Sequence, residues 1–275
     1  ENVNFLLVQG DTNSVLGCAL AASKIGVKIG HVEAGLRSFD RRMPEEINRV
    51  ITDHISDFLF CPTKESVINL KNEGISSNKI FMTGNTIVDA VLNFKDISLK
   101  RSNILEKFKL TKNDFFLFTI HRPANTRNKN SLEKLADILK NISEIFKKTI
   151  VFPAHYRTAN AFKTYNIKLS SNIILIDPVG YLDFLNLQLN AKIIYTDSGG
   201  VQEEACILKV PCITLRENTE RPETVSVGAN IITGLNLNLI LEATEKMLNQ
   251  DFKYDIPFGN GDSGIQIIRI LENNF

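Results

Sequence analysis

The chain has 275 residues, 43% hydrophobic and 23% charged, which is typical of a packed globular protein with room for two ordinary domains. Lysine and arginine total 32 and aspartate and glutamate 31, so the net charge of +1 gives no support for nucleic-acid binding. No apolar run approaches the length of a membrane span and no signal peptide is visible, so we expect a cytoplasmic protein without a membrane partner.

Apolar runs alternate with helical segments along the whole chain. In the first half, strands are predicted at 4–8, 28–32, 57–61 and 79–83. In the second half, they are predicted at 115–119, 150–152, 173–176, 193–196, 212–215 and 231–233. These runs are largely apolar rather than alternating with polar residues. The pattern predicts an α/β fold whose parallel sheets are buried on both faces.

The two halves read as two copies of one architecture. The polar segment 96–103 has no strong periodicity and is interpreted as a linker between residues 1–95 and 104–260, with a final helix in 261–275. About four strands precede this segment, whereas a complete doubly wound nucleotide-binding domain has about six. The first domain is therefore expected to lack its N-terminal strands.

The cysteines and histidines give no metal signal. The four cysteines contain no CxxC pair, and the four histidines lack metal-ligand spacing. We interpret the cysteines as small buried hydrophobes in a reducing compartment, and predict no metal.

Three carboxylates recur where ligands bind in such sheets, at the carboxyl ends of strands. Asp11 and Glu33 follow strands, and Glu45 opens a helix after Pro44. Acids placed together raise one another's pKa and can serve as acid and base. The alternative is that Asp11 and Glu45 merely favour helix starts.

A second candidate lies at Asp197–Glu223. Ser198, Gly199 and Gly200 join a strand to a helix, where unpaired N–H groups and the helix dipole attract phosphate. Glu204 follows inside the helix, and Arg221 comes from the loop after the next strand. We infer an anionic, hydroxyl-bearing ligand such as a nucleotide diphosphate; a well-capped helix without a ligand is the alternative.

Two further motifs were weighed. His121 ends the first strand of the second half and could donate to a phosphate or carry a proton, although such a histidine is more often structural. Residues 259–264 match G-x-G-x-x-G, but they follow no strand and leave no room for a βαβ unit. We therefore predict no nicotinamide cofactor, and no other cofactor.

Taken together, the motifs resemble those of the non-hydrolysing UDP-N-acetylglucosamine 2-epimerases. The matching segments are VQGDTNS, HVEAGLRS, PEEINR, FLFTIHR, DPVGYLDF, TDSGGVQEEA and TERPE, in the order of the family. The resemblance implies two Rossmann-like domains facing a cleft in the glycosyltransferase-B arrangement, a homodimer, and a final helix packed on the first domain. Its usual context is polysaccharide or glycoprotein synthesis.

The resemblance also implies residue roles. It implies that Asp11, Glu33 and Glu45 are the catalytic carboxylates and that His121 contacts the nucleotide diphosphate. It implies a UDP site made of Phe184 at the uridine, Ser198, Gly199 and Gly200 at the phosphates, Glu204 at the ribose, and Arg221. The sequence departs from the family in lacking its initial GTRPE-type loop, in lacking the usual acid shortly after His121-Arg122, and in carrying Val179 before GYLDF.

The implied reaction interconverts UDP-N-acetylglucosamine and UDP-N-acetylmannosamine at C2. That carbon has no neighbouring carbonyl, so direct deprotonation is too slow, and elimination of UDP to a glycal followed by re-addition is the route we predict. Three alternatives stay open: a UDP-sugar-dependent glycosyltransferase, a hydrolysing epimerase that releases N-acetylmannosamine and UDP, and a non-catalytic UDP-sugar-binding fragment.

Overall fold

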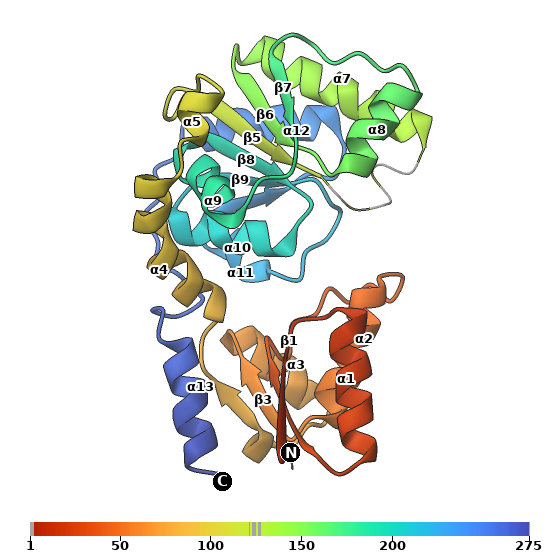
Figure 1. Cartoon of the computed structure of the whole chain (residues 1–275), viewed down its shortest axis with the longest axis vertical. Coiled ribbons are helices and arrows are strands. Elements are labelled where there is room, and N and C mark those ends of the chain that lie inside the picture. Colours follow the sequence, from red (N-terminus) through yellow and green to blue (C-terminus); the bar gives the residue numbers. More distant parts are fainter. Residues whose placement is uncertain (1–2, 121, 123–124, 126–127, 275) are drawn as a thin grey trace. The chain divides into compact units, whose positions relative to one another are not determined.

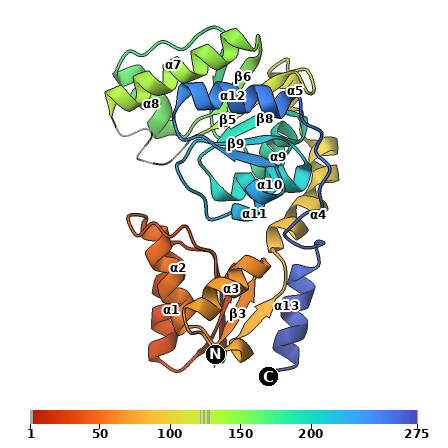
Figure 2. The ribbon, with the colours of Figure 1, turned by 180° about the vertical axis from the view of Figure 1, so that it is seen from behind.

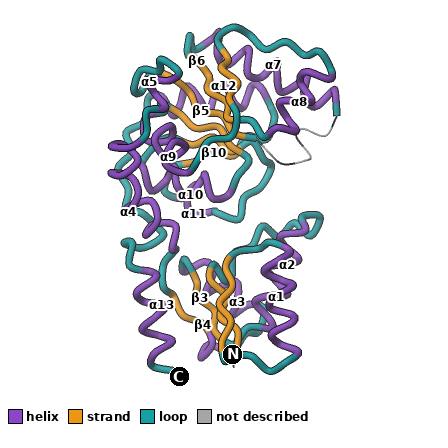
Figure 3. Tube along the Cα trace, in the orientation of Figure 1, coloured by secondary structure: helices purple, strands orange, loops and turns teal. Residues whose placement is uncertain are grey.

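The computed structural model describes residues 3–120, 122, 125 and 128–274. The chain forms two compact units, a first made of Glu1–Ala90 and Ile256–Phe275 and a second made of Val91–Asp255. In each unit the strands form one parallel sheet with helices around it (Figures 1 and 3). The predicted α/β class is confirmed, and each of the ten predicted strands occurs with its ends within one residue of the prediction.

The sheet of the first unit has four strands in the order β1-β2-β3-β4. They are β1 (Phe5–Gln9), β2 (Lys28–Val32), β3 (Phe58–Cys61) and β4 (Ile80–Met82). The connecting helices are α1 (Asn13–Lys24), α2 (Pro44–Ile55) and α3 (Lys64–Asn72), with a short 3-10 helix at Ser77–Lys79. Thr12 caps α1 by accepting a hydrogen bond from the Val15 N–H. Pro44 suits the start of α2, because its missing N–H would have no partner there.

The two faces of this sheet pack against different helices. Val8 of β1 packs with Ala19 of α1 on one face. Phe58 and Phe60 of β3 pack with Ile267 of α13 (Ser263–Glu272) on the other. Figures 1 and 2 accordingly show α1 and α2 along one side of the strands and α13 along the other.

Hydrogen bonds fix the start of α13 to the first unit. The Asp89 carboxylate accepts from the N–H groups of Ser263 at 3.2 Å and Gly264 at 3.0 Å. The Asn85 N–H donates to the Phe258 carbonyl at 2.8 Å. An acid at a helix N-terminus accepts hydrogen bonds from N–H groups that have no partner within the helix, and its negative charge interacts favourably with the helix dipole. The last twenty residues therefore belong to the first unit although they follow the second in sequence.

The sheet of the second unit has six parallel strands in the order β10-β9-β8-β5-β6-β7. They are β5 (Phe115–Thr119), β6 (Thr149–Pro153), β7 (Ile173–Ile176), β8 (Ile193–Thr196), β9 (Cys212–Thr214) and β10 (Asn230–Ile232). The helices are α5 (Ile104–Lys107), α7 (Lys129–Ile145), α8 (Tyr156–Thr164), α9 (Tyr181–Asn190), α10 (Gly199–Leu208), α11 (Pro222–Ser226) and α12 (Leu237–Leu248). Helices α7, α8 and α12 pack on one face, around Phe118 and Tyr195. Helices α5, α9 and α10 pack on the other, around Leu117 and Ile194.

The strand order of the second unit reverses between β5 and β8. The chain builds outward from β5 through β6 to β7, then returns to the other side of β5 and builds outward through β8, β9 and β10. At such a reversal the connections diverge from the carboxyl ends of the two central strands, and ligands bind in the crevice that this leaves. The topology therefore directs attention to the residues that follow β5 and β8.

Residues 96–103 were expected to form a linker without regular structure. This prediction is wrong, because α4 (Thr86–Arg101) runs through most of the segment. Ser98 is buried, and its hydroxyl donates to the Leu182 carbonyl at 2.7 Å. The Ser102 hydroxyl donates to the Asp183 carboxylate at 2.5 Å. The polar residues that suggested a linker are thus contacts to α9, and the division between the units falls earlier, after Ala90.

The cysteine prediction is correct for three positions and wrong for one. Cys61, Cys206 and Cys212 are buried, and burial raises the pKa of the Cys206 thiol to about 12. Cys18 is exposed, because it lies on the outward side of α1 with the exposed Ser14 and Ala21.

Replacing Ile267 by alanine should lower the free energy of unfolding by about 2–4 kcal/mol, because it removes buried methyl groups from the α13 contact with β3. Ile265 lies on the same helix and is 57% exposed, so Ile265→Ala is the matched control and should change stability by no more than about 0.5 kcal/mol. Urea unfolding followed by circular dichroism measures both. Equal effects of the two substitutions would contradict the packing of α13 on the sheet.

Candidate functional site

The residues that follow β5 and β8 in the second unit are tied together by Asp197, which is fully buried. Its Oδ2 accepts from the Arg122 backbone N–H at 2.9 Å and from Asn125 Nδ2 at 3.0 Å. One carboxylate therefore binds Arg122 and Asn125, which follow β5, at the turn that leads into α10. His121, the predicted phosphate contact of that segment, lies outside the described residues.

The predicted phosphate turn is the N-terminus of α10. Ser198 is the N-cap residue; its N–H donates to Thr196 Oγ1 at 3.0 Å, and in the described part of the chain its hydroxyl makes no capping hydrogen bond. Gly199 and Gly200 form the first turn. A Cβ at Gly199 would lie 2.3 Å from Glu220 Oε1, so a larger residue there would displace the Glu220 carboxylate. The turn has the open backbone N–H groups and positive dipole end that favour an anion.

Arg221 lies beside this turn. An ideal Cβ at Gly199 would be 3.8 Å from the Arg221 guanidinium carbon, which places the cation next to the first turn of α10. Arg221 is 5% exposed, and its Nε pairs with Glu203 Oε1 at 2.6 Å. The structure thus brings Arg221 to the glycine turn, as an anion site requires.

Glu204 lies one turn further along α10 and is almost buried. Its Oε2 accepts from Gln188 Nε2 at 2.7 Å, and it also accepts from the Tyr181 hydroxyl. Burial raises the pKa of Glu204, and the hydrogen bonds from Gln188 and Tyr181 act in the opposite direction. Two donors on α9 therefore orient a carboxylate that can still accept hydroxyl groups of a ligand.

Phe184 lies on α9 and is half-buried. It packs with Val201 of α10 against the apolar cluster on that face of the sheet. The ring is therefore held in place by the core, on the helix that also carries Gln188 and Tyr181.

In the first unit, Asp11 comes after β1 and is held by α2. Its Oδ2 pairs with Arg49 Nη1 at 2.6 Å, and Asn48 Nδ2 donates to its backbone carbonyl at 2.8 Å. Arg49 also pairs with Glu46 Oε2 at 2.8 Å, so the buried guanidinium bridges two acids. Glu45 is half-buried in the first turn of the same helix, four residues before Arg49.

Glu33 comes directly after β2, the parallel neighbour of β1. Its φ is 70°, in the left-handed region that a non-glycine residue seldom adopts. Its Oε1 accepts from Gln9 Nε2 at 3.0 Å, and Gln9 also donates to Thr86 Oγ1 at 3.2 Å. Such backbone strain persists only where the surroundings hold it, which is common at functional sites. Asp11 and Glu33 thus follow two neighbouring strands, and Glu45 opens α2, the helix that contacts Asp11 through Arg49.

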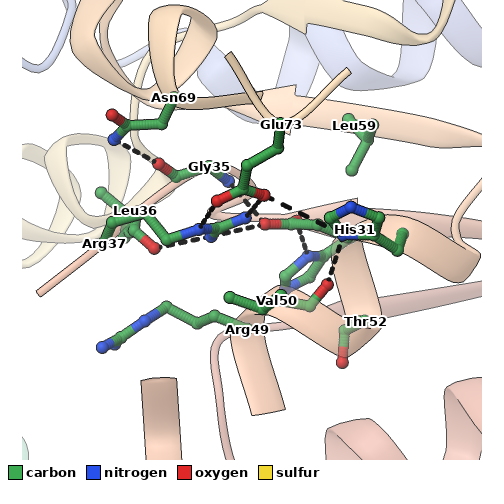
Figure 4. A network of polar contacts seen from close by, with 12 residues as sticks. His31, Gly35, Leu36, Arg37, Arg49, Val50, Thr52, Leu59, Asn69 and Glu73 are labelled. Atoms are coloured by element: carbon green, nitrogen blue, oxygen red, sulfur yellow. Dashed lines mark hydrogen bonds and ion pairs between the residues drawn. The ribbon is translucent and has the colours of Figure 1, made fainter. Parts of the chain in front are cut away.

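A buried polar network in the first unit, which includes His31, Arg37 and Glu73, was not predicted (Figure 4). Asp53 is fully buried; its Oδ1 lies 2.6 Å from His31 Nδ1, and its Oδ2 pairs with Arg37 Nη1 at 2.7 Å. The Gly35 N–H donates to the same Oδ2 at 3.1 Å. Arg37 pairs in turn with Glu73 of the α3 C-terminus at 2.7 Å. Burial disfavours the Asp53 carboxylate, but His31 and Arg37 outweigh it and hold its pKa below the usual value.

Sequence reasoning did not find this network, because only the structure shows which side of α2 is buried. Its buried residues are all polar or charged: Glu46, Asn48, Arg49, Thr52 and Asp53. Ile47 and Ile51 face solvent at 46% and 37% exposure. A helix with its apolar residues outside and its charges inside signals a buried ionic network. No comparable signal points to Gln188 on α9, which only the fold brings to Glu204.

Two general properties limit other kinds of site. Within the described ranges no three side chains of the histidine, cysteine, aspartate and glutamate types are grouped so as to hold a metal ion. None of the described helices is long and apolar enough to cross a membrane.

The fold and these sites define an α/β protein of glycosyltransferase-B type, with a candidate anion site at a strand-order reversal. The family model described as UDP-N-acetylglucosamine 2-epimerase matches residues 1–272. The chain therefore belongs to the UDP-N-acetylglucosamine 2-epimerase family, as its motifs predicted.

Individual relatives agree with this assignment. The UDP-N-acetylglucosamine 2-epimerase of Methanocaldococcus jannaschii is 55% identical over 98% of this chain and 76% of its own length. The enzyme of the same name from Methanococcus maripaludis is 54% identical with the same coverage. The crystal structure of the M. jannaschii UDP-GlcNAc 2-epimerase in complex with UDP-GlcNAc and UDP is similar with a TM-score of 0.92, covering 98% of this chain and 76% of that one.

Asp53→Asn should lower the free energy of unfolding by about 3–5 kcal/mol, because the buried His31 and Arg37 lose their shared anion. The folded-state pKa of Asp53 is lowered, so its stabilisation is present above the unfolded pKa of about 4 and is lost as the pH falls through the folded pKa. Raising the pH through this acid range should therefore increase the free energy of unfolding less in the variant than in the native protein.

Asp251→Asn is the control, because that side chain is 87% exposed and should change stability by no more than about 0.5 kcal/mol. Chemical unfolding between pH 3 and pH 7 measures both variants. An unchanged acid dependence in Asp53→Asn would contradict an ionised Asp53.

Proposed function

We propose that this protein interconverts UDP-N-acetylglucosamine and UDP-N-acetylmannosamine. The relatives reported above are named UDP-N-acetylglucosamine 2-epimerases, and one of their crystal structures contains UDP-GlcNAc and UDP. The observation that carries the proposal is the glycine turn of α10 with Arg221 beside it, at the strand-order reversal of the second unit. This combination suits a diphosphate. The carboxylates of the first unit suit proton transfer.

The second unit is proposed to hold the UDP moiety. The N-terminus of α10, with Ser198, Gly199 and Gly200, would bind the diphosphate, and Arg221 would neutralise its charge. Glu204, oriented by Gln188 and Tyr181, would accept hydrogen bonds from the ribose hydroxyls. Phe184 would line the uridine site, and His121 would contact the diphosphate.

The first unit is proposed to supply the proton transfers. One carboxylate removes the C2 proton while the C1–O bond breaks and its electron pair leaves with UDP, which yields a glycal with a C1–C2 double bond. UDP then adds back to C1 as an acid delivers a proton to the opposite face of C2. Asp11, Glu33 and Glu45 are the groups for these two roles. A diphosphate held by a helix dipole and a guanidinium is a better leaving group, because its developing charge is stabilised.

The family resemblance further leads us to propose a homodimer in the cytoplasm. Light scattering of the purified chain tests the dimer, and a monomeric mass at micromolar concentration would contradict it.

Incubation with UDP-N-acetylglucosamine alone in deuterated water should yield UDP-N-acetylmannosamine that carries deuterium at C2, because the proton removed exchanges with solvent before the return step. Proton NMR and mass spectrometry of the product measure this. Product without deuterium would exclude the elimination route. Release of free N-acetylmannosamine and UDP would instead indicate a hydrolysing enzyme, and UDP binding without turnover would indicate a transferase or a binding protein.

The same Glu→Gln change in each unit separates the two proposed roles. Glu33→Gln should lower kcat by about 10²–10⁴-fold and leave the UDP dissociation constant unchanged, because it removes a proton-transfer group. Glu204→Gln should raise the UDP dissociation constant by about tenfold or more, because it weakens charged hydrogen bonds to the ribose. Calorimetry with UDP and with 2′-deoxy-UDP measures the second effect. If Glu204→Gln weakened both ligands equally, the ribose role would be wrong.

A further inference from the structure

His31 is a buried histidine whose two ring nitrogens both face acceptors. It lies on β2, two residues before Glu33, and is fully buried. Its Nδ1 is 2.6 Å from Asp53 Oδ1, and its Nε2 is 2.9 Å from the Gly10 carbonyl oxygen. A neutral imidazole carries one N–H and can donate to only one of them, whereas an imidazolium donates to both.

The surroundings of Asp53 favour the charge on the ring rather than a proton on the carboxyl group. Asp53 Oδ2 already pairs with Arg37 at 2.7 Å and accepts from the Gly35 N–H at 3.1 Å, and both contacts stabilise an ionised carboxylate. With His31 and Arg37 as cations and Asp53 and Glu73 as anions, these four groups sum to zero charge. Buried charges are tolerated when they are compensated in this way.

The contacts of His31 reach each segment that carries a candidate catalytic acid. The Gly10 carbonyl belongs to the peptide bond that leads into Asp11. Asp53 lies on α2, which carries Glu45 at its start and binds Asp11 through Arg49. Asp53 Oδ2 also holds the Gly35 N–H, and so the turn that contains Glu33. The ring thus connects the end of β1, the end of β2 and helix α2.

We propose that His31 is a positioning residue that carries a proton on both ring nitrogens at pH 8, and that its two hydrogen bonds hold Asp11, Glu33 and Glu45 in the arrangement needed for proton transfer at C2. This role rests on the proposed function. His31 itself has no exposed surface and does not touch substrate. Its effect on catalysis is through the carboxylates alone.

The charges around the ring support this role. Burial disfavours the charged form, but Asp53 on α2, the Gly10 carbonyl after β1 and Glu33 outweigh it, and the pKa of His31 is raised. Arg37 and Glu73 face Asp53 from its other side, and the nearby Cys61 of β3 stays a neutral thiol because burial raises its pKa. As the pH rises through the raised pKa of His31, the ring loses one donor. Its stabilisation, fully present below the unfolded pKa of about 6.5, is then lost.

The ionisation is tested on the full native chain with ¹⁵N-labelled histidine. Long-range proton–nitrogen spectra between pH 6 and pH 9 should show both His31 nitrogens protonated at pH 8, when an ordinary histidine has lost its proton. Assignment comes from the resonance missing in His31→Gln. A ring that titrates near pH 6.5 or shows one bare nitrogen at pH 8 overturns the proposal. This measurement needs no turnover, so an inactive native chain would count against the proposed function and not against the charge.

The positioning role is tested by steady-state kinetics and UDP calorimetry. His31→Gln should lower kcat at least tenfold while the UDP dissociation constant, set by the second unit, stays within twofold. His54→Gln is the matched control on α2, because that ring is 45% exposed and 3.9 Å from Glu73, and its kcat should stay within twofold of native. The double variant His31→Gln, Asp53→Asn restores a neutral hydrogen-bonded pair and should recover part of the lost kcat.

Two results would refute the positioning role of His31: a kcat of His31→Gln equal to that of the native protein, or equal losses of kcat in His31→Gln and His54→Gln. If His31→Gln fails to fold, the double variant and the native nitrogen spectra decide. In the native protein kcat should fall as the pH rises through the raised pKa of His31, because the ring then loses one donor. A folded double variant whose kcat shows no such fall would support the role, and one whose kcat falls as in the native protein would contradict it.

Discussion

The buried carboxylate of Asp53 imposes the constraint on which the first unit depends. An anion withdrawn from water must be neutralised nearby, and here an imidazole, a guanidinium and a backbone N–H do so within 3.1 Å. That requirement turns the polar side of α2 inward and binds the turn after β2 to the helix. Glu33, at a φ of 70°, is held in that turn, so the strained acid and the buried network are parts of one arrangement.

The proposed phosphate site of the second unit depends on backbone groups rather than on a buried ionic network. A phosphate needs positive potential without a rigid partner for each oxygen, and helix N–H groups supply it. The strand-order reversal brings the ends of β5 and β8 side by side, and Asp197 ties their following segments together. Gly199 leaves the space that Glu220 fills, with Arg221 close by. The unit thus places the glycine turn and Glu204 on α10 and Arg221 at the start of α11, and these are the main parts of the proposed UDP site.

The two units also differ in how charge is balanced. In the first, Asp11 and Glu46 share Arg49, and the candidate acids lie at the edge of a compensated ionic interior. In the second, Arg221 pairs with Glu203 of α10, so the helix that would bind the anion also positions the buried cation beside its N-terminus. The proposed elimination and re-addition requires both arrangements, because it needs a held leaving group as well as an acid and a base.

The sequence by itself determined the strands, because short apolar runs bounded by glycine and polar residues form buried parallel strands in an α/β chain. It also determined the candidate residues that stand at strand ends, among them Asp11, Glu33 and the turn at Ser198. Only the tertiary structure decided what surrounds them. His31 and Asp53 are 22 residues apart and Arg37 and Glu73 are 36 apart, so no local pattern links them. The segment 96–103 was misjudged for the same reason: its polar residues bond to α9, more than 80 positions away.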